Sequence, residues 1–202
     1  MVNSAEEKAE LFKRVLFPEV SDADMTDTAR YKYPLPLPAP PISLPEIRRA
    51  ILRAAPGKAP GPDGLLNRAL QQVLPMIEPH LDYIFNWCLR VGYCPKHFRR
   101  SNTVVLRKPG KGDYTNPKNY RPIALLSAIG KALESIIASR ISYLVEQYAL
   151  LPQNHIGGRR GRSCEHALHL LQEQVHAAWR DGYPVATLLT LDVSGAYDNV
   201  FH

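Results

Sequence analysis

The chain has 202 residues, 45% of them hydrophobic, with a formal net charge of +6 and an isoelectric point near 9.3. This composition is sufficient for one domain-sized core, and the positive charge favours a polyanionic partner. No apolar run approaches the roughly 20 residues that cross a bilayer, and no secretory signal segment opens the chain. We expect a soluble, intracellular protein with no membrane partner, and the sequence makes no prediction about its oligomeric state.

The first 42 residues are predicted to form an N-terminal extension rather than a domain. A short charged helix over residues 5–16 is followed by residues 33–41, where alternating prolines exclude helix and central strand. Proline-rich stretches of this kind are stiff spacers. The compact domain is therefore placed at residues 43–202.

Two helices are predicted at the start of this domain. Ser43 and Glu46 fit a capping box, which begins a helix that ends before Gly57. The second helix is expected to be interrupted by Pro75 and Pro79 and to end at Gly92. Its second part carries an apolar stripe that we assign to the core, formed by Leu81, Ile84, Phe85, Cys88 and Leu89.

Strands and helices are then predicted to alternate. Residues 103–107 and 121–126 are expected to form two short strands around a polar loop, and Ser163 is expected to cap a helix that runs to Trp179. The apolar run 185–191 is predicted to be a buried strand. Between them, residues 129–148 form an amphipathic helix whose buried side is predicted to comprise Leu133, Ile136, Ile137, Ile141, Leu144, Val145 and Tyr148. These elements predict a helix-rich α+β fold.

A buried strand that ends in Asp192, followed by small residues, is one way in which a sheet presents an oxygen ligand to a hard cation such as Mg²⁺. An ordinary solvated turn carboxylate is the alternative. The three cysteines match no zinc-ligand spacing with nearby histidines.

Two basic loops suit contacts with phosphate groups. The heptapeptide 58–64, Lys-Ala-Pro-Gly-Pro-Asp-Gly, holds Lys58 and backbone amides in a tight loop. Such a loop would lose little conformational freedom on binding a phosphate backbone. Residues 151–163 place three arginines among glycines before a helix N-terminus, at Arg159, Arg160 and Arg162. The alternative for the 58–64 loop is an ordinary turn. The alternatives for the 151–163 loop are a solvated basic face and a structural role for Arg162, which could bond loop carbonyls.

Four blocks, in this order along the chain, resemble the reverse transcriptases of non-LTR (LINE-type) retrotransposons. They are the 58–64 loop, the segments 104–111 and 119–126 with Gly130-Lys-Ala-Leu-Glu134, the 151–163 loop, and Leu-Asp-Val-Ser-Gly-Ala-Tyr-Asp at 191–198. The third block departs from the family pattern at residues 155–157, where an aromatic residue is more usual. The resemblance implies the right-hand polymerase fold, represented here by fingers and a truncated palm.

The resemblance also implies functional roles for single residues. Lys108 and Arg121 are implied to contact the nucleoside triphosphate, and Lys58 to lie near the RNA template. Asp192 and the carbonyl of Val193 are implied to hold Mg²⁺, as part of a two-metal site. Tyr197 is implied to pack under the incoming sugar and to exclude a 2′-hydroxyl. The implied partners are an RNA template, a DNA primer and deoxynucleoside triphosphates.

The family completes its metal site with a later aromatic-x-Asp-Asp motif, and the sequence contains no Asp-Asp pair. We therefore expect an RNA-directed DNA polymerase present as a fragment that does not polymerise DNA alone. The alternative is a non-catalytic RNA-binding remnant of a retroelement. A P-loop hydrolase is excluded, because neither Gly57-Lys58 nor Gly130-Lys131 has the required glycine spacing or a following Ser or Thr.

Overall fold

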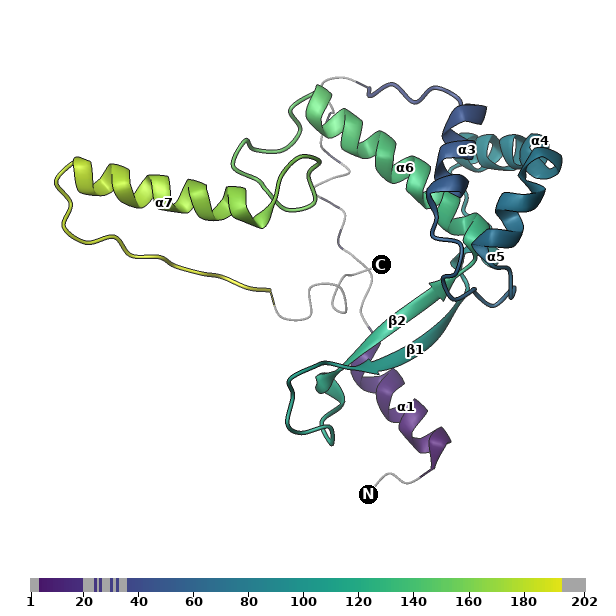
Figure 1. The fold of residues 1–202 in the computed structure, drawn as a ribbon, viewed down its shortest axis with the longest axis horizontal. Coiled ribbons are helices and arrows are strands. Elements are labelled where there is room, and N and C mark those ends of the chain that lie inside the picture. Colours follow the sequence, from purple (N-terminus) through teal and green to yellow (C-terminus); the bar gives the residue numbers. More distant parts are fainter. Residues whose placement is uncertain are drawn as a thin grey trace. The chain divides into compact units, whose positions relative to one another are not determined.

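The computed structural model describes residues 4–19, 24, 26, 30, 32 and 36–193. The chain divides into two compact units, each of which is described by itself: among the described residues, the first comprises those up to Ile136 and the second comprises Ile137–Val193 (Figure 1). The described residues form helices and one two-stranded antiparallel sheet. This confirms a helix-rich α+β composition. No described helix is both long enough and apolar enough to span a membrane.

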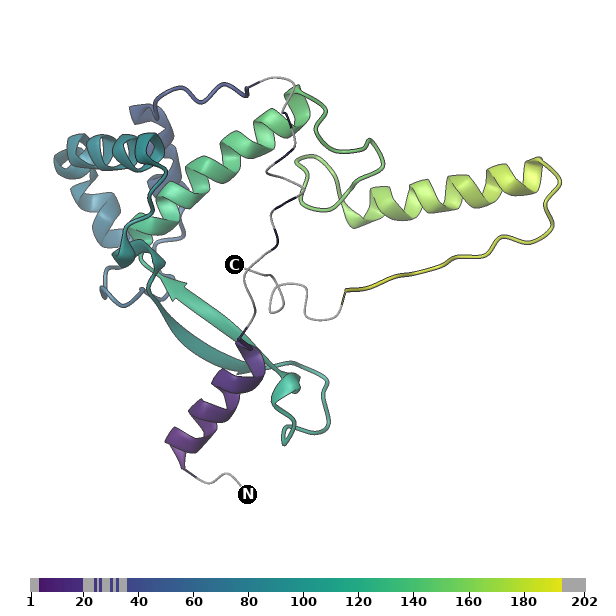
Figure 2. The same ribbon diagram turned by 180° about the vertical axis from the view of Figure 1, so that it is seen from behind.

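The predicted N-terminal helix is confirmed as α1, Ala5–Leu16. It begins with a capping box in which Ser4 and Glu7 each bond the other's backbone amide. Its apolar side lies against η1, a 3₁₀ turn at Pro117–Asn119, and both ribbon views show α1 beside this end of the sheet (Figure 2). The rings of Phe12 and Tyr120 meet edge to face, with centroids 4.8 Å apart.

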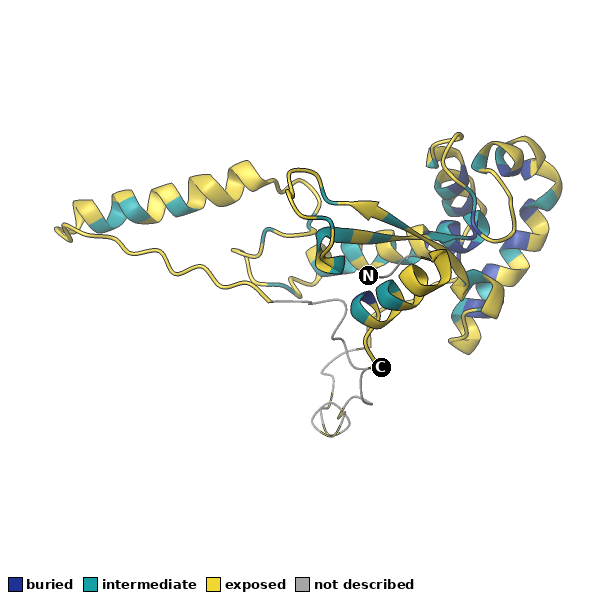
Figure 3. Cartoon of the chain, turned by 90° about the horizontal axis from the view of Figure 1, so that it is seen from below, coloured by how far each residue is buried: buried dark blue, intermediate teal, exposed yellow. Residues whose placement is uncertain are grey.

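The core of the first unit is built around α3, Leu44–Arg53, and α4, Asn67–Val91. Ser43 and Glu46 form the predicted capping box. Ile47 and Phe85 are fully buried, and the buried positions gather in these helices and at the start of α6 (Figure 3). The buried apolar residues of this region are Ile42, Ile47, Ile51, Leu70, Leu74, Leu81, Phe85, Cys88, Ala132, Leu133 and Ile136.

The predicted interruption of α4 is wrong, because the helix continues through Pro75 and Pro79. Proline removes one backbone hydrogen bond, and a helix tolerates this loss as a bend when packing holds both sides. The ribbon of α4 changes direction along its length while keeping Leu74 and Leu81 buried (Figure 1). The helix ends at Gly92 as predicted, with this glycine in the left-handed region at φ 67°.

The two predicted strands are confirmed as β1, Ser101–Arg107, and β2, Tyr120–Leu126. They follow the short helix α5, Lys96–Arg99, and pair antiparallel from Ser101 opposite Leu126 to Arg107 opposite Tyr120. The next helix, α6, spans Ala128–Gln147. Gly130 brings this helix close to Phe98, because a Cβ on Gly130 would lie 3.0 Å from the Phe98 Cβ.

The predicted buried side of α6 is only partly correct. Leu133 and Ile136 are buried, whereas Ile141 is 56% exposed and Tyr148 is 44% exposed. The buried positions lie in the half of the helix that belongs to the first unit. Helical spacing identifies a face, but a face is buried only along the length that has packing neighbours.

The second unit contains α7, Cys164–Arg180, with Ser163 as its N-cap as predicted, and the helix ends one residue beyond the predicted Trp179. The predicted buried strand at 185–191 is wrong: this segment has no regular structure, and Leu191 is 88% exposed. A strand requires a neighbour for its backbone hydrogen bonds. Within the described residues, β1 and β2 pair with each other and leave the 185–191 segment without such a neighbour.

Candidate nucleotide and nucleic-acid interface

The strand register places Lys108 and Arg121 on one face of the β1–β2 hairpin. Arg121 lies opposite Leu106, and the ladder continues one step further, because the Lys108 amide donates to the Asn119 carbonyl at 2.9 Å. Residues two apart on a strand share a face, and so do cross-strand partners. Lys108 and Arg121 are therefore diagonal neighbours, about 7–8 Å apart by this geometry.

The loop at the tip of the hairpin holds Lys108 through both its backbone and its side chain. The ammonium Nζ donates to the Lys118 carbonyl at 2.6 Å, and the Lys108 carbonyl accepts from the Tyr114 hydroxyl at 3.0 Å. An ammonium has three donors, so two remain available to an anion. Arg121 is exposed. The pair thus presents one fixed cation and one open guanidinium.

Arg107 lies on the opposite face of the hairpin and is engaged there. Its guanidinium lies 4.9 Å from the centre of the Tyr114 ring, and the Tyr120 hydroxyl donates to the Tyr114 carbonyl at 3.0 Å. Sequence reasoning missed this role of Tyr114, because an aromatic in a polar loop carries no periodic pattern. The sequence offers one indication of this role: Tyr114 lies six residues before Tyr120, in the loop that joins the two predicted strands.

The 58–64 loop is held against the base of the hairpin. Gly61 is buried, and a Cβ at this position would lie 2.5 Å from the Leu126 carbonyl carbon. The Asn67 side chain donates to the Ala55 carbonyl at 2.8 Å, which ties the approach to this loop to the start of α4. Lys58 itself is exposed. Gly61 thus allows the loop backbone to lie close to the backbone at Leu126, while Lys58 is exposed to solvent.

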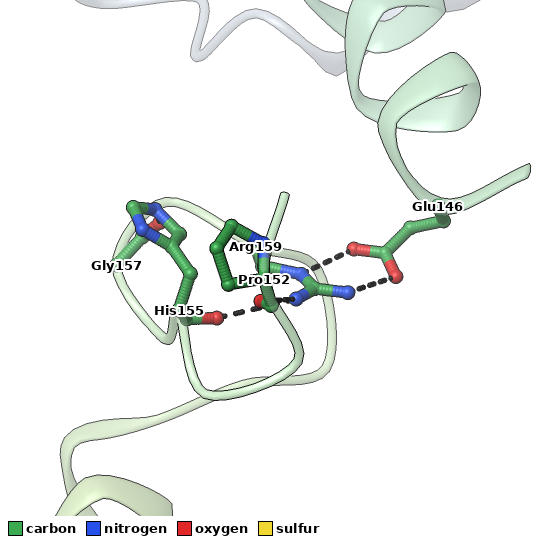
Figure 4. Close-up of polar contacts among 5 residues, drawn as sticks. All are labelled: Glu146, Pro152, His155, Gly157 and Arg159. Carbon is green, nitrogen blue, oxygen red and sulfur yellow. Dashed lines mark hydrogen bonds and ion pairs between the residues drawn. The ribbon is translucent and has the colours of Figure 1, made fainter. Parts of the chain in front are cut away.

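In the second unit, the Arg159 side chain forms its hydrogen bonds within the chain (Figure 4). Its guanidinium donates twice to the Glu146 carboxylate, at 2.8 and 2.7 Å, and also to the carbonyls of Pro152 and His155, at 2.9 and 3.3 Å. The side chain is only 8% exposed. These bonds favour the charged forms, so they lower the pKa of Glu146 and raise that of Arg159.

Arg160 and Arg162 belong to the same loop but remain exposed. The structural role that the sequence left open for Arg162, bonding loop carbonyls, is performed by Arg159. A guanidinium whose five donors are largely used inside the loop has little to offer a phosphate. The assignment of phosphate contacts in this loop is therefore confined to Arg160 and Arg162.

Asp192 and Val193 lie in the extended segment that follows α7, and both are exposed. Tyr197 lies outside the described residues. Across the part of the chain that is described, no group of three or more His, Cys, Asp or Glu side chains is arranged to hold a metal ion. The strand register thus brings together Lys108 and Arg121, whereas the described residues gather no set of metal ligands around Asp192.

Residues 106–202 match the family described as reverse transcriptase (RNA-dependent DNA polymerase). The chain is 29% identical to a probable RNA-directed DNA polymerase from transposon BS of Drosophila melanogaster, over all of this chain and 23% of that protein. It is 32% identical to the RNA-directed DNA polymerase from mobile element jockey of Drosophila funebris, over 95% of this chain and 21% of that protein. The chain belongs to the non-LTR retrotransposon reverse transcriptases.

A third relative of this reverse transcriptase chain is the Pol polyprotein of type-1 retrotransposable element R1 from Bradysia coprophila, 29% identical over 92% of this chain and 18% of that protein. The family predicted from the four sequence blocks is thus confirmed. The chain spans about a fifth of the length of these relatives.

Proposed function

We propose that this chain supplies the fingers and the first part of the palm of an RNA-directed DNA polymerase with the right-hand fold. The observation that supports this most directly is the pair Lys108 and Arg121 on one face of the hairpin. The proposed partners are an RNA template, a DNA primer and deoxynucleoside triphosphates. The template contacts are assigned to Lys58, Arg160 and Arg162.

The hairpin pair suits a triphosphate for electrostatic reasons. Phosphoryl transfer accumulates negative charge on the leaving pyrophosphate, and fixed cations offset that charge without reorganising during the reaction. Lys108 is already oriented by the Lys118 carbonyl, so little side-chain entropy is lost on binding. Arg121 adds a planar fork that bonds two phosphate oxygens at once.

Asp192, with the Val193 carbonyl, is proposed to contribute to a Mg²⁺ site, and Tyr197 is proposed to exclude the 2′-hydroxyl of a ribonucleotide. Bound Mg²⁺ would supply charge neutralisation at the transferring phosphate. The described residues offer one carboxylate at this position and no cluster of metal ligands, so they do not complete such a site. We therefore assign this chain the binding and positioning of the nucleotide rather than the transfer step.

Binding of dTTP to the 202-residue chain tests the proposal. Lys108→Ala and Arg121→Ala should each weaken binding by about tenfold, as expected for a charge-assisted hydrogen bond. Lys111→Ala is the matched control. Lys111 is an exposed lysine in the same loop, so this substitution removes the same charge. Equal losses in all three variants would show general attraction rather than a site, and would overturn the assignment.

A non-catalytic RNA-binding remnant remains the second candidate, favoured by the single carboxylate of the described 185–193 segment. Nucleotide binding separates the two functions. Binding of dTTP that Lys108→Ala weakens supports the polymerase fragment. Salt-dependent RNA binding without dTTP binding supports the remnant.

A further inference from the structure

A hollow of about 310 Å³ lies in the first unit between the C-terminal end of α3, the 58–64 loop and the beginning of α6. Three cations line it, namely Arg53 from α3, Lys58 from the loop and Lys131 from α6. Its other lining residues are small, apolar or uncharged, and none is a carboxylate. We call this feature the basic hollow.

Among the described residues, the observed ion pairs do not involve the three cations of the basic hollow. Arg48 pairs with Glu78 and Arg159 pairs with Glu146, and neither pair includes a cation of the hollow. Like charges that share a concave site repel one another, and an anion bound between them removes that repulsion. The hollow is therefore complementary to a compact, multiply hydrogen-bonding anion.

The position of Lys131 supports the same conclusion. It is the fourth residue of α6, whose first turn contains no acidic residue. The N-terminal end of a helix carries partial positive charge, so a lysine there is electrostatically unfavourable. An anion in the basic hollow would be attracted by both the lysine and the helix end.

The walls of the basic hollow are fixed before any ligand binds. The Gln71 side chain donates to the carbonyls of Ile51 and Ala54, at 3.0 and 2.8 Å, and so ties the end of α3 to α4. Gly61 packs against the backbone at Leu126, which joins the loop to the segment leading into α6. Rigid walls lower the entropic cost of binding.

We propose that the basic hollow binds one phosphate group of an RNA backbone, with Arg53 and Lys131 acting together with Lys58. This inference rests on the proposed function, because it specifies how the template-binding loop grips RNA. It adds Arg53, which lies in none of the four sequence blocks, and Lys131, which lies in the second block but to which the sequence assigned no role. Free phosphate and pyrophosphate offer the same anionic oxygens as an RNA phosphate. Competition between RNA and pyrophosphate separates these possible ligands.

The test is binding of a single-stranded RNA oligonucleotide to the full 202-residue chain over a range of salt concentrations. Arg53→Ala and Lys131→Ala should each weaken binding by about tenfold, and each should make the slope of log affinity against log salt shallower by about 0.7, the value for one lost phosphate contact. Arg49→Ala is the matched control, because Arg49 is an exposed cation on the same helix outside the hollow. It should change affinity by less than about twofold.

Equal losses in Arg53→Ala and Arg49→Ala would overturn the proposal while leaving the proposed function intact. Inorganic pyrophosphate is the second probe, and RNA displaced by it at equal phosphate concentration would assign the basic hollow to free phosphate instead. If the wild-type chain binds no RNA, the template part of the proposed function fails. The anion site is then supported only by pyrophosphate binding that Arg53→Ala abolishes, and the absence of such binding overturns it.

Discussion

Gly61 lies where the 58–64 loop meets the end of β2, and its lack of a side chain is a requirement of that contact. A Cβ here would lie 2.5 Å from the Leu126 carbonyl carbon and 2.6 Å from the Ser127 amide nitrogen. Both atoms belong to the backbone, so neither can rotate away. The contact therefore explains why a glycine is needed at the fourth residue of this loop.

Gly61→Ala should lower the free energy of unfolding by about 2–3 kcal/mol, the cost of forcing extra atoms into a packed site. Urea unfolding followed by circular dichroism measures this change. Gly57→Ala is the matched control in the same turn region, because a Cβ there meets nothing within 4 Å. The control should change stability by less than about 0.5 kcal/mol. Equal effects of the two substitutions would contradict the close approach.

The arginines of the 151–163 loop show the limit of sequence reasoning at the residue scale. Composition and spacing treat Arg159, Arg160 and Arg162 alike, as cations among glycines. The structure separates them, because Glu146 lies thirteen residues before Arg159 and its carboxylate accepts two hydrogen bonds from the Arg159 guanidinium. A partner so distant in sequence leaves no local pattern, so the distinction could not be predicted.

At the scale of elements, α1 is positioned to brace the loop that carries Lys108. Phe12 packs edge to face on Tyr120, whose hydroxyl bonds the Tyr114 carbonyl, and Tyr114 in turn bonds the Lys108 carbonyl. Leu16, one helical turn beyond Phe12, is buried. The contacts form a continuous series from the N-terminal helix to the proposed triphosphate site.

Phe12→Ala should therefore loosen the 108–119 loop without unfolding the core. We expect hydrogen exchange at the Lys108 and Asn119 amides to accelerate by about two- to tenfold, the range that one aromatic pair supplies. Phe17→Ala is the control directly after α1, because Phe17 is 52% exposed. Phe12→Tyr keeps the ring and should restore protection. Unchanged exchange in Phe12→Ala would show that α1 does not brace the loop.

Local chemistry explains which elements were predictable. The ends of helices at Ser43, Gly92 and Ser163 depend on residues within four positions, and all three were predicted correctly. The 103–107 and 121–126 strands were predictable because they are neighbours in sequence and pair with each other across the single loop 108–119. The 185–191 strand failed because no described segment pairs with it, and α4 passed through its prolines because packing of Leu74 and Leu81 outweighs two lost hydrogen bonds.

At the scale of the whole chain, the two units differ in how much side-chain burial stabilises them. The first unit holds every buried apolar residue of the described part of the chain, including the fully buried Ile47 and Phe85. No residue between 137 and 193 is buried. A 17-residue helix such as α7 is only marginally stable in water when packing adds little.

The α7 amides should consequently exchange with solvent long before those of α3 and α4. Residue-resolved hydrogen exchange should show α7 opening with a free energy near that of an isolated helix, while α4 opens only with global unfolding of the first unit. Ile47→Ala provides the control: it should lower α3 and α4 protection by about 2–5 kcal/mol and leave α7 unchanged. Protection of α7 equal to that of α4, lost in parallel in Ile47→Ala, would mean that the two units unfold as one. In that case the stability of the Arg160 and Arg162 loop would derive from the first unit's core rather than from the Arg159–Glu146 pair within the second unit.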